Sequence, residues 1–433
     1  MERQTVRLGI IGAGNVGAAL VAMLLDESRF PALLEAVGAP LSISAIAVRD
    51  ASKVRPGIPA KLLTTDPLAL ATRDDVDIVV ELAGGVDDAY RYVHAALSAG
   101  KSVVTANKAL IAAKGTELEA LARLQNVDLI FEAAVGGGIP ILRALRTSLV
   151  GEKIHRVMGI VNGTTNFILS AMASDGADYG DVLAEAQRLG YAEADPTADV
   201  EGFDAAAKVT ILSALSFGTS LEGAAIARQG ISAITADDVA FAKRHHYVIK
   251  LVGVAERVGE FGISMRVHPA MLPEAHPLAS INGAFNAVFV EGAKAGPLMM
   301  MGQGAGGNPT ASAVLGDILE AGRNRLLGRR SATPDVETNL HMIPQGELQS
   351  SFYLTLDVLD RPGVLAAVTS VFGDHGVSIR LMEQSGMGDE ARLTLVTHLA
   401  LESDMTATLE DLQTVDTVDA IGACIRIVGE DLA

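Results

Sequence analysis

Short, almost uninterrupted apolar runs alternate with amphipathic stretches over the first third of the chain. The run at 6–11 leads into the glycine-rich segment 12–17 and then into a stretch of helical composition. Such runs, separated by helix-like segments, are typical of parallel strands that are covered on both faces. The pattern predicts an α/β fold with a doubly wound parallel sheet of the Rossmann type. Its further strands are expected at 43–48, 78–82, 102–105 and 129–133, with helices such as 89–99 and 116–124 between them.

The sequence pattern changes after about residue 135, where glycines cluster and longer helical segments begin. Strand-like runs at 156–161, 246–254 and 287–290 are embedded among them, which predicts a second, mixed α+β domain. The segment 321–346 is rich in Arg, Thr, Pro and polar residues and has the composition of a linker.

Beyond this segment the pattern predicts a third, small domain. Strand, helix, strand, strand, helix and strand are expected in this order, which is a ferredoxin-like βαββαβ arrangement. The domain boundaries that follow are 1–134 for dinucleotide binding, 135–320 for catalysis and dimerisation, 321–348 for the linker and 349–433 for the last domain. We also expect the last helix of the second domain to be able to pack back on the first.

Composition and charge restrict the class of function. The chain has 433 residues and a formal net charge of −18, which argues against nucleic acid or an anionic membrane as the partner and favours a small molecule. Cys424 is the single cysteine, so no internal disulfide can form and a reducing compartment is indicated. No apolar run is long enough to span a bilayer. The sequence therefore predicts a cytoplasmic protein.

The turn Gly12-Ala13-Gly14-Asn15-Val16-Gly17 follows a strand and opens a helix. In this context Gly12, Gly14 and Gly17 permit a tight turn and a close approach of the backbone to a pyrophosphate, which then lies at the positive end of the helix dipole. We interpret the turn, including Asn15 and Val16, as a dinucleotide site. The alternative is a simple glycine turn.

The end of the second predicted strand bears on the choice of cofactor. NAD-binding sheets usually place an acidic residue there, whereas this chain has Arg49, followed by Asp50. A guanidinium suits the 2′-phosphate of NADP. We therefore predict NADP, with NAD possible if Asp50 binds the ribose instead.

Two lysines are candidates for the chemistry. Lys208 is the only charged side chain between Asp204 and the end of the apolar run at Phe217, and a desolvated ammonium must be paired or put to use. Asp204, one helical turn earlier, is a natural partner. Lys108 follows a predicted strand at the edge of the sheet where ligands bind, and a lysine there can steer a carbonyl oxygen or donate a proton. Taken alone, Lys208 would be interpreted as a surface residue on an amphipathic helix, whereas Lys108 could equally be a surface residue at a helix start.

Several motifs together resemble those of the homoserine dehydrogenases. These are VVTANK at 103–108, GIVNGTTNFIL at 159–169, LGYAEADP at 189–196, the spacing of Asp199, Asp204 and Lys208, and GQGAGG at 302–307. The segment DRPGVL at 360–365 is similar to the ACT regulatory domains. Some members of the family carry an aspartate kinase ahead of the dehydrogenase. Since only residues 1–5 precede the first strand, we expect a monofunctional enzyme.

This resemblance implies interconversion of L-aspartate 4-semialdehyde and L-homoserine with NAD(P)H. It implies that Glu193 binds the α-ammonium of the substrate and that Asp204 orients it. Lys208 corresponds to the proposed proton donor and Lys108 to a second catalytic lysine between cofactor and substrate. The resemblance further implies Asp199 in substrate binding and Thr105, Lys108 and Gly306 in cofactor binding.

The loop after the fifth predicted strand resembles the monovalent-cation loop of the family. Glu132 and the backbone carbonyls of Val135, Gly137 and Ile139 could surround a cation such as Na⁺, because oxygen ligands suit a hard ion. A flexible hinge between two domains is the alternative. By contrast, we expect the methionines at 299–301 to pack in a core strand.

For the C-terminal domain the resemblance implies a sensor of an amino acid, for which L-threonine is the expected effector. The ligand would lie near 360–364 and 377–380, at an interface between paired domains. A dimerisation module that binds nothing is the alternative, and a homodimer or homotetramer is expected in both cases. Two other functions remain open, a non-catalytic sensor of dinucleotide and amino acid and another NAD(P)-dependent dehydrogenase of an amino or oxo acid.

Overall fold

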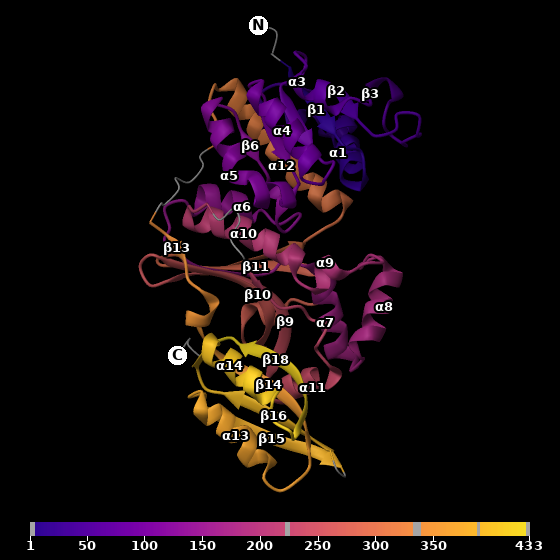
Figure 1. The fold of residues 1–433 in the computed structure, drawn as a ribbon. Helices are drawn as coiled ribbons and strands as arrows, with labels where there is room; N and C mark the ends of the chain where they lie inside the picture. Colours follow the sequence, from indigo (N-terminus) through magenta and orange to yellow (C-terminus); the bar gives the residue numbers. More distant parts are fainter. Residues whose placement is uncertain (1–4, 221–225, 332–338, 388–389, 430–433) are drawn as a thin grey trace. The chain divides into compact units, whose positions relative to one another are not determined.

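The computed structural model describes residues 5–220, 226–331, 339–387 and 390–429 (Figure 1). The chain divides into two compact units. The first comprises Met1–Val157, Thr210–Ala224 and Asn286–Thr338, and the second comprises Met158–Val209, Ala225–Phe285 and Asn339–Ala433. Each unit is therefore assembled from segments that are far apart in the sequence.

The first unit is built on a parallel six-stranded sheet with the order β3-β2-β1-β4-β5-β6. This order is that of a Rossmann dinucleotide-binding sheet, with its reversal of direction between β1 and β4. The prediction of a doubly wound parallel sheet is confirmed. The strands are β1 (Val6–Ile11), β2 (Leu41–Ala47), β3 (Leu63–Thr64), β4 (Ile78–Glu81), β5 (Ser102–Thr105) and β6 (Leu129–Ile130).

The connecting helices place their apolar residues against the sheet. Val6, Leu8 and Ile10 of β1 are at most 1 % exposed and belong to one hydrophobic cluster with residues of the first helices. Burial of such side chains contributes roughly 1.5–3 kcal/mol each to stability. The helices are α1 (Asn15–Leu25), α2 (Phe30–Val37), α3 (Pro67–Thr72), α4 (Asp87–Ser98), α5 (Lys108–Leu124) and α6 (Ile141–Arg143).

A late helix, α12 (Gly307–Leu326), completes this core and is drawn in orange among the indigo and purple elements of the first unit (Figure 1). Its buried face packs on α1 and on the sheet. Near its end, Arg325 donates a hydrogen bond of 2.8 Å to the nearly buried Asp77, which also accepts from Arg7. The helix thus runs six residues past residue 320, into the segment predicted as a linker, because these residues still have a core to cover.

The first unit also contains most of β7 (Ile154–Ile160), β11 (Phe285–Gly292) and β12 (Gly296–Gln303), paired in the order β12-β11-β7. The expectation that Met299–Met301 pack in a core is wrong. Met299 is 37 % exposed and Met301 55 %. Strand β12 lies at the edge of its sheet, so these side chains are not covered within the chain.

The second unit is built around a long antiparallel hairpin of β9 (Tyr247–Val258) and β10 (Gly262–Pro273). Strand β10 also pairs in parallel with the short β8 (Ala227–Arg228) and β13 (His341–Met342). The helices of this part are α7 (Gly163–Asp175), α8 (Tyr179–Leu189), α9 (Thr197–Val200), α11 (Ala236–Arg244) and α10 (Phe203–Phe217), which begins in this unit and ends in the first.

The C-terminal part of the second unit has the predicted βαββαβ order. Its four main strands are arranged β18-β14-β16-β15, as in a ferredoxin-like sheet, and its two main helices bury apolar residues against this sheet. Strand β18 also pairs in parallel with β10 through Ala270 and Met271, so the two sheets are joined. The elements are β14 (Gln349–Leu359), α13 (Val364–Asp374), β15 (Ile379–Met387), β16 (Glu390–Thr397), β17 (Ala400–Leu401), α14 (Glu402–Leu412) and β18 (Val418–Ile427).

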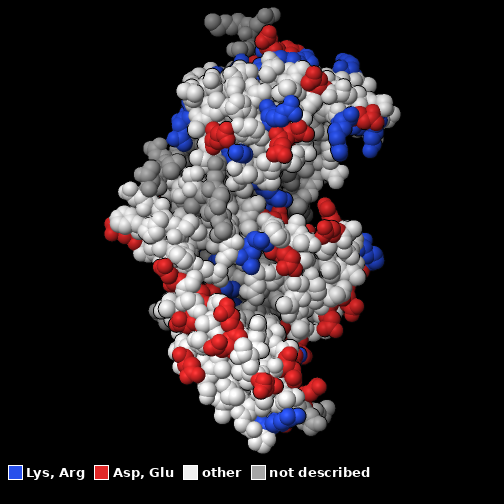
Figure 2. All heavy atoms as spheres, viewed as in Figure 1, with Lys and Arg blue, Asp and Glu red and all other residues white. Residues whose placement is uncertain are grey.

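The surface agrees with the acidic composition. On the face shown in Figure 2, acidic side chains are spread widely, and basic ones stand in small groups with acidic neighbours. Within the described ranges, no helix is both long and apolar enough to cross a membrane.

Candidate active site

The three glycines of the first turn have three different surroundings. A Cβ on Gly12, which has φ +104°, would lie 2.7 Å from the carbonyl carbon of Leu82, and one on Gly17 would lie 2.3 Å from the carbonyl oxygen of Gly12. A Cβ on Gly14 would meet nothing within 4 Å. The outer two glycines therefore permit tight packing, whereas the middle one leaves open space in which a ligand can approach the backbone.

Two helix N-termini lie side by side at this turn. Gly14 precedes α1 and Gly306 precedes α12, and neither helix has a side-chain cap. A Cβ on Gly307 would lie 3.1 Å from the carbonyl oxygen of Asn15, so the two helices begin in close contact. Uncapped N–H groups at the positive ends of two helix dipoles suit a pyrophosphate. The structure thus brings together Gly12, Gly14, Asn15, Val16, Gly17 and Gly306 of the predicted cofactor site.

The loop after β2 carries Arg49 and Asp50, both exposed. The Asp50 carboxylate accepts hydrogen bonds from the hydroxyl and the backbone N–H of Ser52 at 2.6 and 2.9 Å, which lower the pKa of Asp50. Arg55 donates to the carbonyl oxygens of Asp50 and Lys53. Asp50 is thus engaged in its own turn, while the side chains of Arg49, Lys53 and Arg55 make this loop basic. Lys53 and Arg55 belong to no motif in the sequence, so only the structure shows that they lie on this loop.

The carboxyl ends of β4 and β5 are joined by a buried carboxylate. Glu81 accepts a hydrogen bond of 2.6 Å from the hydroxyl of Thr105 and two more from the N–H groups of Ala83 and Gly84. The Thr105 hydroxyl also accepts from the N–H of Asn107 at 3.0 Å. Because Thr105 is fully buried, its side chain acts on the site through the turn that it holds.

Asn107 and Lys108 open α5 at this same edge of the sheet. The Asn107 side chain caps the helix by accepting from the N–H of Leu110 and donates to the carbonyl oxygen of Gly85 at 2.6 Å. Lys108, the first residue of the helix, is half-buried. The structure therefore places Lys108 at the edge where the glycine turn lies, as the sequence predicts.

In the second unit, Asn162, Asp199, Asp204 and Lys208 form one hydrogen-bonded cluster. The amide nitrogen of Asn162 donates to Asp199 at 2.7 Å and to Asp204 at 2.9 Å. The Lys208 ammonium donates to Asp204 at 2.7 Å and to the carbonyl oxygen of Val161 at 2.6 Å. The side chains of Asp204 and Lys208 are only 8 % and 10 % exposed, so this ion pair is largely shielded from water.

An ammonium has three N–H donors. The acceptors that the described residues supply to Lys208 use two of them, so one donor is left for a substrate oxygen. Asn162 is the N-cap of α7 and holds both carboxylates in place. Sequence reasoning assigned Asn162 no role, although an Asn directly before a helix is a recognisable cap.

Glu193 lies on the loop after α8 and is exposed. The loop is held to α7 by a hydrogen bond from the Thr164 hydroxyl to the carbonyl oxygen of Tyr191 and by contact between the rings of Tyr191 and Phe167. Gln187 donates to the carbonyl oxygen of Glu193 itself. The carboxylate of Glu193 has no polar partner among the described residues, which leaves it available to a cationic ligand.

A second buried lysine, Lys250 on β9, was missed. It is fully buried, and its ammonium donates to the carbonyl oxygen of Ile281 at 2.6 Å and to Asn166 at 3.0 Å, with Ser170 and Asn282 slightly farther. Burial lowers the pKa of Lys250 to about 8. Lys250 also interrupts an apolar run, so the signal that identified Lys208 could have identified it.

The predicted cation loop is tightly tied to its surroundings. The Glu132 carboxylate accepts from the N–H groups of Leu142 and Arg143 at 2.8 and 2.6 Å, and burial raises the pKa of Glu132. The carbonyl oxygen of Ile139 accepts from the N–H of Ile141. Oxygen lone pairs remain at these atoms and at the carbonyls of Val135 and Gly137, so the donor set fits a hard monovalent ion. Within the described residues, no group of three or more His, Cys, Asp or Glu is placed to hold a metal.

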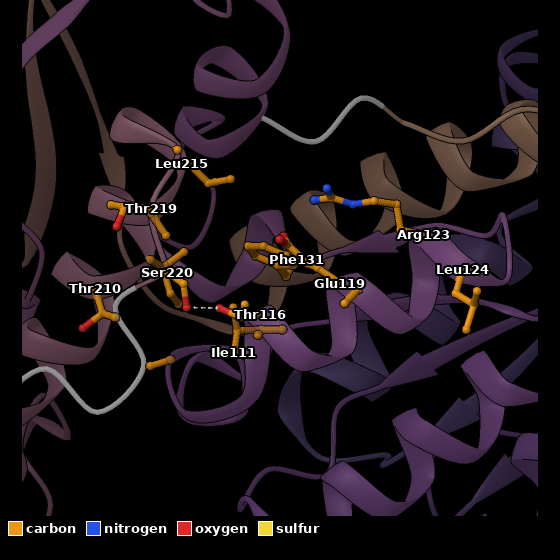
Figure 3. A pocket seen from close by; sticks show the side chains of 16 residues that line it. Ile111, Thr116, Glu119, Arg123, Leu124, Phe131, Thr210, Leu215, Thr219 and Ser220 are labelled. Carbon is orange, nitrogen blue, oxygen red and sulfur yellow. Dashed lines mark hydrogen bonds between the residues drawn. The ribbon is translucent and has the colours of Figure 1, made fainter. Parts of the chain in front are cut away.

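Two cavities lie apart from these residues. One of about 460 Å³ in the first unit is lined by α5, the end of α10 and Phe131, with a hydrogen bond between Thr116 and Ser220 on its wall (Figure 3). The other, of about 320 Å³, lies at the turn after β14 and is lined by residues 358–365 with Gln384 and Leu393. The second cavity contains the predicted effector segment 360–364, but residues 377–380 do not line it.

A Rossmann sheet with two uncapped helix N-termini at its glycine turn is typical of nicotinamide-dependent oxidoreductases. The shielded Asp204–Lys208 pair can exchange a proton, and a ferredoxin-like domain completes the chain. Family profiles described as "Homoserine dehydrogenase" and "Homoserine dehydrogenase, NAD binding domain" match residues 140–319 and 12–132. A profile described as "ACT domain" matches residues 352–417.

Curated proteins and solved structures give the same answer. The homoserine dehydrogenase of Corynebacterium glutamicum is 50 % identical over 98 % of this chain and 95 % of its own. That of Mycobacterium tuberculosis is 46 % identical over 100 % and 99 %. The crystal structure of a homoserine dehydrogenase from Thiobacillus denitrificans superimposes with a TM-score of 0.93 at 40 % identity, over 99 % of both chains. A hyperthermophilic archaeal homoserine dehydrogenase in complex with NADPH covers 73 % of this chain and 98 % of its own, with a TM-score of 0.62 at 31 % identity.

The chain belongs to the homoserine dehydrogenase family and is an oxidoreductase with a C-terminal ACT domain. The two alternative functions, a non-catalytic sensor and a dehydrogenase of another amino or oxo acid, are not supported by these matches.

Proposed function

We propose that this enzyme interconverts L-homoserine and L-aspartate 4-semialdehyde, with Lys208 as the group that exchanges a proton with the C4 oxygen. The observation that carries the proposal is the shielded Asp204–Lys208 pair with one N–H donor left for a ligand. A nicotinamide cofactor supplies the hydride acceptor or donor. The protein contributes the position and protonation of the oxygen. Lys108, at the edge of the first sheet, is the second proposed catalytic lysine and acts beside the cofactor. Oxidation of L-homoserine by the purified protein tests the reaction itself, and absence of turnover with both NAD⁺ and NADP⁺ would contradict it.

The carboxylates of the cluster suit the amino end of the substrate. Glu193 is exposed and without a polar partner among the described residues, so it binds the α-ammonium. Asp199 and Asp204 both accept from Asn162, which fixes the two carboxylates side by side, and we assign both to substrate binding. The assignment of these roles rests on the family's motifs together with this geometry.

NADP is the cofactor that the first unit favours. Support comes from the loop after β2, because Asp50 is held by Ser52, whereas Arg49 and its basic neighbours are exposed at the end of that strand. The archaeal homoserine dehydrogenase compared above binds NADPH in its own structure.

Replacing Arg49 by alanine tests this preference. We expect Arg49→Ala to raise KM for NADP⁺ by about tenfold, the loss expected for one charge-assisted hydrogen bond, and to change KM for NAD⁺ by less than about twofold. Lys61→Ala, which removes an exposed cation from the same unit, is the control. Equal changes for both cofactors would show that Arg49 does not contact the 2′-phosphate.

The loop at Glu132, Val135, Gly137 and Ile139 is the proposed site of a monovalent cation such as Na⁺. A cation that binds only the folded protein raises Tm. We therefore expect a higher Tm in NaCl than in choline chloride at equal ionic strength, and a smaller difference for Glu132→Gln. Equal Tm values in both salts would contradict the site.

The ACT domain is proposed to bind L-threonine as a feedback effector. Support comes from the cavity at residues 358–365, where Gln384 donates to Asp360 and leaves the polar turn accessible. Calorimetric titration with L-threonine and its effect on turnover test the proposal, and an enzyme that neither binds threonine nor is inhibited by it would contradict it.

A homo-oligomer, dimer or tetramer, is proposed from the exposed apolar side chains of β12. Leu298, Met299 and Met301 lie on an edge strand, and such a surface favours association. Sedimentation equilibrium that gives a monomer at micromolar concentration would contradict this. A cytoplasmic location stays a prediction from the sequence.

A further inference from the structure

A short segment in the second unit contacts both the ACT domain and the turn that lies between Asp199 and Asp204. We call residues 227–232 the strap. It begins as β8, which pairs with β10 at Arg266 and Val267, and it continues through Gln229 to Ser232. The backbone N–H of Gln229 donates to the carbonyl oxygen of Val267 at 2.9 Å. The strap therefore has a fixed base on the strand that lies next to the ACT strand β18.

On the ACT side, the Gln229 side chain makes two hydrogen bonds to β18. Its amide nitrogen donates to the carbonyl oxygen of Cys424 at 2.7 Å, and its amide oxygen accepts from the guanidinium of Arg426 at 3.0 Å. Arg426 in turn pairs with the buried Glu402 at the start of α14. The side-chain amide of Gln229 thus bonds to both a backbone atom and a side chain of the ACT sheet.

On the catalytic side, the strap is bonded to the turn at 200–202. The N–H of Ile231 donates to the carbonyl oxygen of Val200 at 2.9 Å, and the hydroxyl of Ser232 donates to Glu201 at 2.8 Å. A Cβ on Gly230 would lie 2.6 Å from the carbonyl oxygen of Val200, so the two backbones are in direct contact.

This turn sets the position of the catalytic carboxylates. Asp199 directly precedes it and Asp204 follows two residues after it, and both accept from Asn162. Gly202 has φ +77°, and a Cβ there would lie 3.0 Å from the side chain of Val267 on β10. The turn is therefore confined between the strap and β10, and a shift of the strap is transmitted to both carboxylates.

We propose that Gln229 is a positioning residue, which ties β18 of the ACT domain to the turn of Asp199 and Asp204 and through which an amino acid bound to the ACT domain acts on the active site. The proposal rests on the proposed regulation. In physical terms, the ACT sheet has two arrangements, to which the effector binds with different affinity. The Gln229 amide makes both of its hydrogen bonds in only one of these two arrangements.

The test compares the full-length wild-type enzyme with Gln229→Met, which keeps the length of the side chain but makes neither hydrogen bond. L-Threonine is titrated into both by calorimetry, and kcat and KM for L-homoserine are measured at each threonine concentration. We expect equal threonine affinity within about twofold, a maximal inhibition at saturating threonine that is severalfold weaker in the variant, and a KM for homoserine raised several-fold without threonine. Gln125→Met, at an exposed position after α5, is the control and should match the wild type.

A conservative variant tests whether the effects of Gln229→Met come from the lost hydrogen bonds or from loss of folding. Gln229→Glu keeps the acceptor for Arg426 but cannot donate to Cys424, so its inhibition by threonine should lie between those of the wild type and Gln229→Met. Inhibition and KM that are unchanged in Gln229→Met would overturn the proposal. If the wild type neither binds threonine nor is inhibited by it, the proposed effector is wrong, and the KM of Gln229→Met then decides the positioning role by itself.

Discussion

Lys208→Ala lowers kcat for homoserine oxidation by about a hundredfold or more, the scale expected when a general acid or base is lost. The side chain donates to Asp204 and Val161 and has one N–H left for the C4 oxygen, so no other group of the cluster can take over its proton. The dinucleotide turn belongs to the other unit. The affinity for NADPH, measured by fluorescence titration, should therefore change by less than about twofold.

The control for this prediction is Lys114→Ala, which removes an exposed lysine from α5. Removing one partner of a shielded ion pair also destabilises the protein, so Tm of each variant is measured and kcat is compared well below it. The double variant Asp204→Asn, Lys208→Met, which leaves no unpaired charge, should be as inactive as Lys208→Ala. Near-normal turnover in a folded Lys208→Ala enzyme would show that the proton donor is elsewhere.

Lys250→Met changes how stability depends on pH. Burial lowers the pKa of Lys250 from 10.5 to about 8, so the unfolded chain binds more protons than the folded one between these two values. Stability therefore rises with pH across this window in the wild type, because the folded state loses the cost of a buried charge. One pKa unit corresponds to roughly 1.4 kcal/mol. Between pH 7 and pH 10, the free energy of unfolding of the wild type should therefore rise by about 2–3 kcal/mol more than that of Lys250→Met.

Urea denaturation of both proteins at a series of pH values measures this difference, and other titrating groups cancel in the comparison. Lys243→Met, at an exposed position on α11, is the matched control. Its free energy of unfolding should differ from that of the wild type by the same amount at every pH. If the curves of wild type and Lys250→Met run parallel from pH 7 to pH 10, Lys250 has an ordinary pKa and is not desolvated as its contacts suggest.

Much of the fold was predictable because its signals are local. Glycines at 12, 14 and 17 between an apolar run and a helix can serve few purposes, and the structure gives each the surroundings that a dinucleotide turn requires. The pairing of Lys208 with Asp204 was predictable for the same reason, since four residues separate neighbours on a helix.

What escaped sequence reasoning depends on contacts between distant segments. Asn162 becomes important only because the fold brings it to Asp199 and Asp204, some forty residues later in the chain. The last six residues of α12 continue the helix because they still cover the core of the first unit, where Ala321 is fully buried and Arg325 bonds to Asp77. The exposed methionines of β12 could not be recognised because an edge strand has the same pattern as a buried one.

The central claim is that the shielded Lys208 ammonium bonds to the C4 oxygen of the substrate. A crystal structure of the ternary complex with NADP⁺ and L-homoserine measures it directly. We expect the Lys208 Nζ atom within hydrogen-bond distance, about 2.7–3.2 Å, of the C4 oxygen. A complex in which the Lys208 ammonium points away from the C4 oxygen and water occupies its place would contradict this claim.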